Sequence, residues 1–161
     1  MPSTAYLSLG SNLGNREQSL RQAIARLMEA GTVVQQSSIY ETEPVEFTAQ
    51  PWFLNCVVEL ETEMTPRRLL AELLAIEQEM GRERTQKKGP RVIDLDILLF
   101  GDLVTSSADL TIPHPAMQER RFVLEPLVEI APQVTHPRLK KTAKELLERL
   151  PSGQSVRQIA R

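Results

Sequence analysis

The chain has 161 residues, enough for one domain with a sizeable apolar core. Hydrophobic residues make up 41% and charged residues 25%, which excludes an intrinsically disordered chain and an integral membrane protein. The formal net charge of -2 argues against a general nucleic-acid-binding protein. Any affinity for phosphate must therefore come from a local cluster of cations.

Cysteine content and the N-terminal sequence bear on the cellular compartment. The single cysteine, Cys56, provides no disulfide framework and fits a reducing compartment. The first residues lack the charged and apolar regions of a signal peptide, and no apolar run approaches the length of a membrane span. We therefore expect a cytoplasmic protein with no membrane partner.

The first predicted elements are a short strand, a turn and a helix. Residues 5–9 alternate in polarity and predict a strand, and residues 10–15 form a glycine-punctuated turn. Asn15 is a suitable N-cap for a helix that Gly31 ends. The turn lacks the Gly-Lys-Ser/Thr ending of a phosphate-binding P-loop, so we interpret it as mainly structural.

Two further strands are predicted, over residues 32–40 and 53–60, with an acidic loop at 41–51 between them. Alternation in the later strand places Phe53 and Asn55 on the face away from the core. A ring beside an amide suits the binding of a flat heterocycle. A partly covered Phe and a surface Asn are also common on sheet faces, and the residues alone favour this simpler interpretation.

A second helix begins at Thr65-Pro66 and ends at Gly81, with leucines along one side. A basic segment follows and carries five cations against one acid: Arg82, Arg84, Lys87, Lys88 and Arg91. Its position directly before two aspartates favours a role with a magnesium-bound polyphosphate over a merely solvated loop.

The stretch from Gly89 to Phe100 is the most informative in the chain. Alternation predicts that Ile93, Leu95, Ile97 and Leu99 fill one face of a strand, which leaves Asp94 and Asp96 on the other. Their Cα atoms would lie about 6.6 Å apart, within reach of one metal ion or of two ions about 4 Å apart. The alternative is a solvated face that happens to hold two acids.

The order strand, helix, strand, strand, helix, strand predicts an α+β fold. We expect a ferredoxin-like βαββαβ core with a C-terminal αβ extension, and residues 1–161 as a single domain. Both helices should cover one face of an antiparallel sheet and leave the other free for Asn55, Asp94 and Asp96. In the extension, His114 lies between two prolines, which fits a fixed ligand-binding imidazole and a turn histidine with no role equally well. Residues 151–161 suggest no chemistry.

With these motifs in view, the chain resembles the 6-hydroxymethyl-7,8-dihydropterin pyrophosphokinase family of folate biosynthesis. The matching motifs occur in the family's order between residue 10 and about residue 132: Gly10-Ser11-Asn12-Leu13-Gly14, Phe53-Leu54-Asn55, Gly81-Arg82, Gly89-Pro90-Arg91 with Asp94-Leu95-Asp96-Ile97, Pro113-His114 with Arg120 and Phe122, and Glu129-Ile130-Ala131-Pro132. The Gly-Pro-Arg and Asp-Leu-Asp combination is the most specific of these.

The resemblance implies that ATP donates its terminal pyrophosphate to the pterin hydroxymethyl oxygen and that AMP is released. It implies two Mg²⁺ ions held by Asp94 and Asp96, and transition-state stabilisation by Arg82 and Arg91. It places ATP against Leu70, Arg84, Ile97, Thr111, His114 and Arg120. It places the pterin against Thr42, Pro44, Val45, Phe53, Asn55 and Phe122. We expect a monomer that has no nucleic-acid partner.

Three positions depart from the family pattern. Lys88 stands where many members have tryptophan, Pro115 where several have an aromatic residue, and Asp109 where several have arginine. These departures affect the assignments around the nucleotide more than the catalytic ones.

Two other classes of protein share some of these motifs. A polymerase-β-type nucleotidyltransferase also uses Gly-Ser and Asp-x-Asp, but there the motifs lie within about a dozen residues, whereas Ser11 and Asp94 are far apart. A non-enzymatic ferredoxin-like module that binds RNA would display aromatic residues within its central strands, and this sheet offers only Phe53 on its open face.

Overall fold

The computed structural model describes residues 2–43, 51–81, 92–151 and 156–160. Its elements follow in this order: β1 (Ser3–Ser11), α1 (Arg16–Leu27), β2 (Thr32–Gln36), β3 (Ile39–Thr42), β4 (Phe53–Thr62), α2 (Pro66–Glu79), β5 (Asp94–Phe100), β6 (Thr105–Ser106), β7 (Thr111–Ile112), a 3₁₀ turn (Met117–Glu119), α3 (Arg121–Ile130), β8 (Thr135–His136), β9 (Lys141–Thr142), α4 (Ala143–Glu148) and β10 (Val156–Ala160). Within this part of the chain, no helix is long and apolar enough to cross a bilayer.

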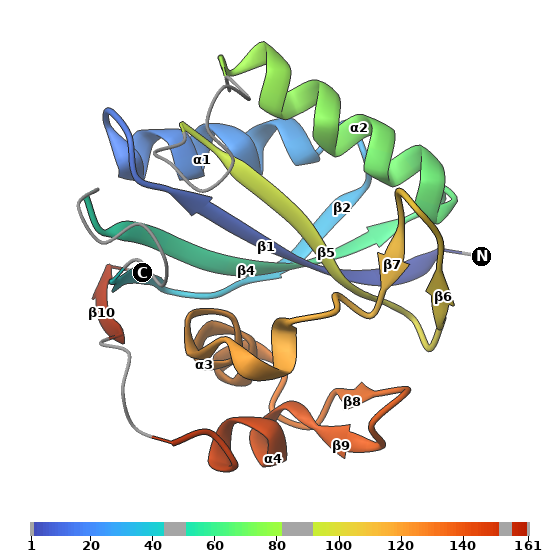
Figure 1. The fold of residues 1–161 in the computed structure, drawn as a ribbon. Helices are drawn as coiled ribbons and strands as arrows, with labels where there is room; N and C mark the ends of the chain where they lie inside the picture. Colours follow the sequence, from blue (N-terminus) through green and yellow to red (C-terminus); the bar gives the residue numbers. More distant parts are fainter. Residues whose placement is uncertain (1, 44–50, 82–91, 152–155, 161) are drawn as a thin grey trace.

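A six-stranded sheet forms the centre of the molecule. Its strands lie in the order β10-β3-β4-β1-β5, with β2 paired to β4 beyond the end of β3. The pairs within this sheet are antiparallel. Helices α1 and α2 lie on one face, and α3 and α4 lie on the other side (Figure 1). The predicted ferredoxin-like βαββαβ core is therefore confirmed.

The two predicted helix starts are also confirmed. The Asn15 side chain accepts a hydrogen bond from the Gln18 backbone, and Thr65 accepts one from the Arg68 backbone with Pro66 next to it. Gly31 follows α1 where the chain passes very close to β4, and a Cβ there would collide with the Glu61 carbonyl oxygen. Glycine is thus required by the packing as well as by the helix end.

Two apolar clusters lie on the two faces of the sheet. The larger cluster joins the sheet to α1 and α2 and includes Leu54, Cys56, Val58 and Leu60, as their alternation along β4 predicted. The smaller cluster packs Val57 and residues of β5 against α3 and α4. The expectation of a free second face is therefore wrong. The apolar positions of α3 require cover, and they obtain it from this face.

Three further expectations differ from the structure. The predicted strand over 32–40 divides into β2 and β3, because Ser37 turns its hydroxyl to accept a hydrogen bond from the Val57 backbone. Leu74 was assigned to the apolar side of α2 but is 41% exposed. Residues 156–160, for which no role was expected, form β10 at the edge of the sheet.

A β-bulge changes the predicted facing of β5. Leu95 and Ile97 pair with Leu9 and Leu7, but Leu99 pairs with Tyr6, so one extra residue separates these pairs. Leu99 consequently joins the smaller cluster, on the face opposite to the one expected. The Leu98 carbonyl at the bulge accepts a hydrogen bond from the His114 backbone, which joins the C-terminal extension to this strand.

Candidate active site

Asp94 and Asp96 lie on one face of β5, as predicted. Asp94 is paired with Gly10 of β1 and Asp96 with Ser8, whereas Leu95 between them is buried in the larger core. Both aspartates are half-buried. The bulge begins only beyond Ile97, so it does not disturb the two-residue spacing that sets the carboxylates side by side.

Gly10 leaves a gap at the centre of this face. It lies between Asn55 of β4 and Asp94 of β5 in the two registers. A Cβ at residue 10 would lie 2.8 Å from Asn55 Oδ1 and 3.5 Å from Phe53 Cδ1. The missing side chain allows the amide and the ring of β4 to approach the backbone of β1, which is a structural use of glycine.

Thr42, Phe53 and Asn55 form a small group on adjacent strands. Thr42 pairs with Phe53 in the β3–β4 register, and Asn55 Nδ2 donates a hydrogen bond to Thr42 Oγ1 over 2.6 Å. Asn55 is only 3% exposed, so the interpretation of a surface asparagine is wrong. A buried amide held by a neighbour has a fixed orientation, which suits the recognition of polar edges on a flat ligand.

A cavity of about 240 Å³ opens beside the outer edge of β5. Its lining includes four residues that the resemblance assigned to ATP, together with one predicted metal ligand: Leu70, Ile97, Thr111, His114 and Asp96. They come from α2, from β5 and from the segment around β7. The structure therefore brings together residues that are spread over 45 positions of the chain.

His114 is fixed in a neutral form beside this cavity. The Ala116 backbone donates a hydrogen bond to its Nδ1, so the ring proton lies on Nε2, which is a donor. Burial, and secondarily the charge of Arg120, lowers the pKa of His114 from 6.5 to about 4, although Asp94 acts in the opposite direction. At neutral pH this imidazole can donate to an anionic oxygen without carrying a charge.

Arg120 links the two groups of predicted binding residues. Its guanidinium carbon lies 5.5 Å from the centre of the Phe122 ring, and its charge acts on His114. Arg120 does not line the cavity itself, unlike four of the other residues assigned to ATP. The guanidinium therefore lies near a predicted nucleotide contact and near a predicted pterin contact.

Phe122 occupies the first turn of α3, a helix that lies on the side of the sheet opposite to α1 and α2 (Figure 1). Five of the predicted residues lie outside the described part of the chain: Arg82, Arg84, Arg91, Pro44 and Val45. Lys88, one of the three departures from the family pattern, also lies outside it.

The structure also shows that Asp109 has a partner. Arg67 of α2 forms an ion pair with Asp109 over 2.9 Å, and the Ser107 hydroxyl donates a hydrogen bond to the same carboxylate. Hydrogen bonds from Arg67 and then from Ser107 lower the pKa of Asp109. Asp109 and Pro115 both line the cavity, so two departures from the family pattern lie in the same place.

Two residues that support the site were not identified from the sequence. Glu77 of α2 is only 2% exposed, and its Oε2 accepts a hydrogen bond from the Leu95 backbone between the two aspartates. Asn12 is 1% exposed, and its Nδ2 donates to the Pro51 carbonyl just before β4. In the sequence, the one indication for Glu77 is that this acidic residue falls on the buried side of α2, directly after Ile76.

The donor set at β5 is compatible with magnesium. Carboxylate oxygens are the protein ligands that Mg²⁺ prefers, and the ion is commonly held by one or two carboxylates together with substrate phosphates and water. Over the described ranges, no cluster of three or more acidic, histidine or cysteine residues is arranged around a common point. Asp94 and Asp96 therefore offer a partial shell of the kind that a nucleotide-bound Mg²⁺ requires.

Comparisons with known proteins agree with these features. Residues 6–132 match the family model described as 7,8-dihydro-6-hydroxymethylpterin-pyrophosphokinase (HPPK). The chain is 51% identical over 136 residues to the Bacillus subtilis 2-amino-4-hydroxy-6-hydroxymethyldihydropteridine pyrophosphokinase, which covers 83% of this chain and 81% of that protein. It is 48% identical over 155 residues to the Schizosaccharomyces pombe folic acid synthesis protein fol1, covering 95% of this chain.

The relatives differ in length. This chain spans only 21% of the S. pombe protein, although it spans most of the B. subtilis one. A crystal structure of Plasmodium falciparum HPPK-DHPS matches 92% of this chain and 44% of that chain with a TM-score of 0.74 at 17% identity, which supports the fold. The family match covers well over half of the chain, and so the chain belongs to the 7,8-dihydro-6-hydroxymethylpterin-pyrophosphokinase (HPPK) family.

Proposed function

We propose that this chain transfers pyrophosphate from ATP to the hydroxymethyl group of 6-hydroxymethyl-7,8-dihydropterin in folate biosynthesis. The pterin oxygen forms a bond to the β-phosphorus of ATP, and the bond between that phosphorus and the α,β-bridging oxygen breaks. AMP leaves with the bridging oxygen, and the hydroxyl proton passes to solvent. The family match and the named relatives support this reaction.

One observation carries the proposal on the structural side. Across three neighbouring strands, the same sheet face presents the amide of Asn55, the gap at Gly10 and the carboxylate of Asp94. A heterocycle placed at the gap would therefore have a polar anchor on one side and a metal ligand on the other. This is the arrangement that a transfer between a pterin and a magnesium-bound polyphosphate requires.

The pterin side would act by positioning. Asn55 uses its Nδ2 to bind Thr42, which leaves its Oδ1 beside the gap as an acceptor for ring N–H groups. Phe53 and Phe122 offer ring faces on β4 and α3, and stacking would hold the ring plane. We assign Pro44 and Val45 to the same site on the family resemblance alone.

The nucleotide side would bind adenine against Leu70 and Ile97 in the cavity and the phosphates near His114 and Arg120. His114 donates from Nε2 as a neutral group, whereas Arg120 supplies a permanent positive charge. The resemblance adds Thr111 and Arg84 to this side. It also adds Arg82 and Arg91, which would stabilise charge that develops on the transferring group.

Asp94 and Asp96 would hold two Mg²⁺ ions. When bound, these ions neutralise phosphate charge and align the attacking and leaving oxygens. The protein contributes the fixed spacing of the two carboxylates along β5, and Glu77 supports it by holding the Leu95 backbone between them. A monomeric state and a cytoplasmic location complete the proposal, and light scattering of the purified chain tests the first of these.

The test is AMP release from ATP, measured with and without the pterin and with and without Mg²⁺. We expect AMP only when both the pterin and Mg²⁺ are present, and no ADP. AMP or ADP that forms equally without the pterin would overturn the assigned acceptor. Full activity in the presence of excess chelator would overturn the metal assignment and leave the transfer reaction standing.

A further inference from the structure

We infer that Arg16 is a positioning residue for the pterin site and that Arg157 of the C-terminal strand β10 supports it through Glu41. This inference rests on the proposed function. It concerns a group of charges behind the sheet, on the face opposite to the candidate site, for which that function assigns no role.

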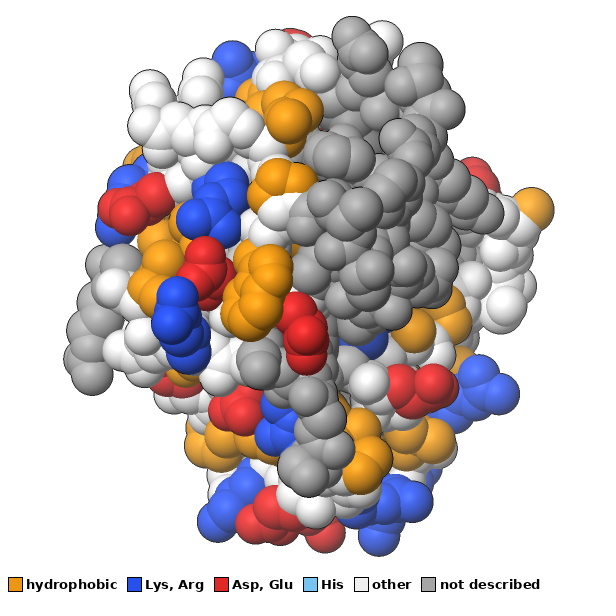
Figure 2. Space-filling model, turned by 60° about the vertical axis from the view of Figure 1, so that its left-hand side comes forward, with side chains coloured by type: hydrophobic (Ala, Val, Ile, Leu, Met, Phe, Trp, Pro, Cys, Tyr) orange, Lys and Arg blue, Asp and Glu red, His pale blue; other side chains and the backbone are white. Residues whose placement is uncertain are grey.

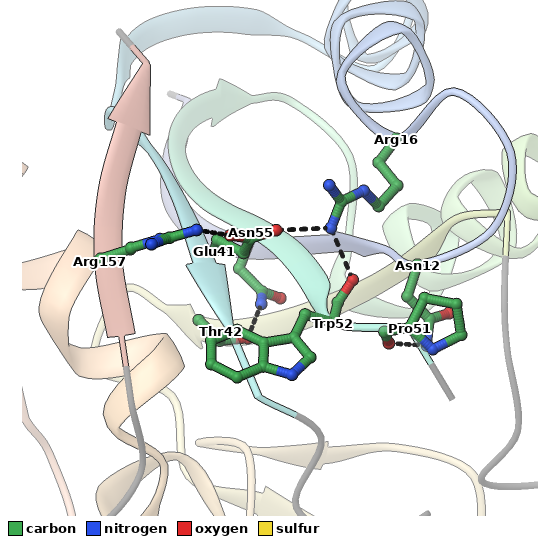
Figure 3. Close-up of polar contacts among 8 residues, drawn as sticks. All are labelled: Asn12, Arg16, Glu41, Thr42, Pro51, Trp52, Asn55 and Arg157. Carbon is green, nitrogen blue, oxygen red and sulfur yellow. Dashed lines mark hydrogen bonds and ion pairs between the residues drawn. The ribbon is translucent and has the colours of Figure 1, made fainter. Parts of the chain in front are cut away.

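Arg16 binds two separate strands with one nitrogen atom. Its Nη1 donates to Glu41 Oε2 over 3.1 Å and to the Trp52 carbonyl oxygen over 2.8 Å. Figure 3 shows the guanidinium, from the first residue of α1, between β3 and the start of β4. A single side chain thus bridges the two strands at this end of the sheet.

The two attachment points lie directly next to predicted pterin contacts. Glu41 precedes Thr42 on β3, and Trp52 precedes Phe53 on β4, where Thr42 and Phe53 are paired. Successive residues of a strand point to opposite faces. From behind the sheet, Arg16 therefore contacts the Glu41 side chain and the Trp52 backbone. The residues that follow these two, Thr42 and Phe53, direct their side chains to the front face, where they form the candidate site together with Asn55.

Arg157 completes the group from the other side of Glu41. It pairs with Glu41 in the β10–β3 register, and its Nη2 donates to Glu41 Oε1 over 2.6 Å (Figure 3). Each carboxylate oxygen therefore has its own guanidinium. The hydrogen bond from Arg157, followed by that from Arg16, lowers the pKa of Glu41, so the carboxylate stays charged at neutral pH.

Burial separates the contributions of the two arginines. The Arg16 side chain is 29% exposed and the Glu41 side chain 15%, whereas Arg157 is 73% exposed. Solvent screens the Arg157 pair more strongly. Arg16 also satisfies the Trp52 carbonyl, in addition to its ion pair. Arg16 should therefore have the larger effect. Asn12, whose Nδ2 donates to the Pro51 carbonyl, supports the same end of β4 independently.

The test compares Arg16→Ala, Arg16→Lys and Arg157→Ala with the wild-type chain. Arg21→Ala is the matched control, because Arg21 lies on the same helix and forms an exposed i,i+4 ion pair with Glu17. For each protein, KM is measured for the pterin and for ATP by AMP release, and pterin binding is measured by calorimetry.

We expect Arg16→Ala to raise the pterin KM and Kd by about tenfold, and Arg157→Ala by about twofold to threefold, with the KM for ATP unchanged within about twofold. Lysine at position 16 can still donate to both oxygens, so Arg16→Lys should recover most of the loss. Arg21→Ala should match the wild type.

Four outcomes of these measurements decide whether the inference stands. Wild-type chain that forms no pterin-dependent AMP would overturn the proposed function and this inference with it. An active wild type whose pterin KM is unchanged by Arg16→Ala would overturn the inference alone. Equal loss of affinity for both substrates would also overturn it, because Arg16 would then serve the fold in general. The exposed Arg157→Ala variant should remain folded even if Arg16→Ala does not, and an unchanged pterin KM there would remove Arg157 from the account.

Discussion

The two halves of the candidate site are built in different ways. On the predicted pterin side, Thr42, Phe53, Asn55 and Gly10 lie on three adjacent strands, and the β3–β4 and β4–β1 registers set their spacing; Phe122 is added from α3. The nucleotide side is a cavity between the edge strand β5, the helix α2 and the segment around β7. The strand register therefore sets the geometry of one side, and the packing of separate segments against a sheet edge sets the other.

On the face shown in Figure 2, basic and acidic side chains of the described residues are interspersed with apolar ones rather than gathered in fields of one sign. Among the described residues, Arg120 supplies positive charge at the candidate site. Substitutions on one side should consequently affect one substrate and spare the other.

The largest expected effect is that of Asp96→Asn. The change removes a predicted metal ligand at nearly constant volume, so turnover should fall by about 100-fold or more while the fold and the pterin affinity are retained. AMP release, circular dichroism and calorimetry measure these three quantities. Asp102→Asn, at an exposed position in the turn after β5, is the control and should leave turnover unchanged. Near-normal turnover of the Asp96 variant would count against the metal site.

Gly10→Ala should break the pterin side. The new methyl group would lie 2.8 Å from Asn55 Oδ1, so the buried amide must move or the heterocycle is excluded. We expect the pterin KM to rise by about tenfold or more, with the KM for ATP much less affected. Gly101→Ala is a useful contrast, because its positive φ of 55° strains alanine but its Cβ meets no neighbour. That variant should lose stability and keep its pterin KM, and a similar KM change in both variants would refute the role of the gap.

Leu70→Phe should affect the nucleotide side in the complementary way. A larger side chain in the cavity competes with the base, and we expect the ATP KM to rise by about fivefold while the pterin KM stays unchanged. Leu74→Phe, one turn further along α2 and 41% exposed, is the matched control. If both variants leave the ATP KM unaltered, then adenine does not bind against α2.

The smallest expected effect is on the stability of the fold at acid pH, through the protonation of His114. Its pKa is lowered from 6.5 to about 4, so the unfolded chain binds more protons between these values. The free energy of unfolding is therefore highest above about pH 6.5, where His114 is neutral in both states. It falls by at most about 3 kcal/mol as the pH falls toward 4, because the unfolded chain takes up the proton more readily.

Urea unfolding of the ligand-free chain and of His114→Gln, compared across this pH range, measures the contribution. The chain has only one other histidine, His136, whose pKa is also lowered by burial and which is common to both proteins. The difference between the two unfolding curves therefore isolates His114. A difference that is independent of pH would contradict the assigned neutral form.

The correct predictions from the sequence concern features that depend only on residues close together in the chain. The caps at Asn15 and Thr65 use side-chain hydrogen bonds within three residues, and the common face of Asp94 and Asp96 depends only on strand alternation. The nucleotide assignments of Leu70, Ile97, Thr111 and His114 came from the family resemblance. Nothing in the local sequence pattern around these residues indicates that they line one cavity.

What the sequence did not predict depends on contacts between distant segments. The bulge that reverses Leu99 is held by a hydrogen bond from the His114 backbone, which comes from the C-terminal extension. The burial of Asn55 depends on Thr42 and on the approach of β4 to Gly10. Strand β10 pairs with β3 across more than a hundred residues, and no residue of that short segment signals its partner.

The identity of the products tests the central claim most directly. Phosphorus NMR of a reaction that contains ATP, Mg²⁺ and 6-hydroxymethyl-7,8-dihydropterin distinguishes AMP from ADP and a pyrophosphate ester from a monophosphate ester. We predict AMP and the pterin pyrophosphate ester in equal amounts, with no ADP. ADP together with a phosphorylated pterin would contradict attack at the β-phosphorus, and unreacted pterin beside a folded, ATP-binding chain would contradict the assigned acceptor.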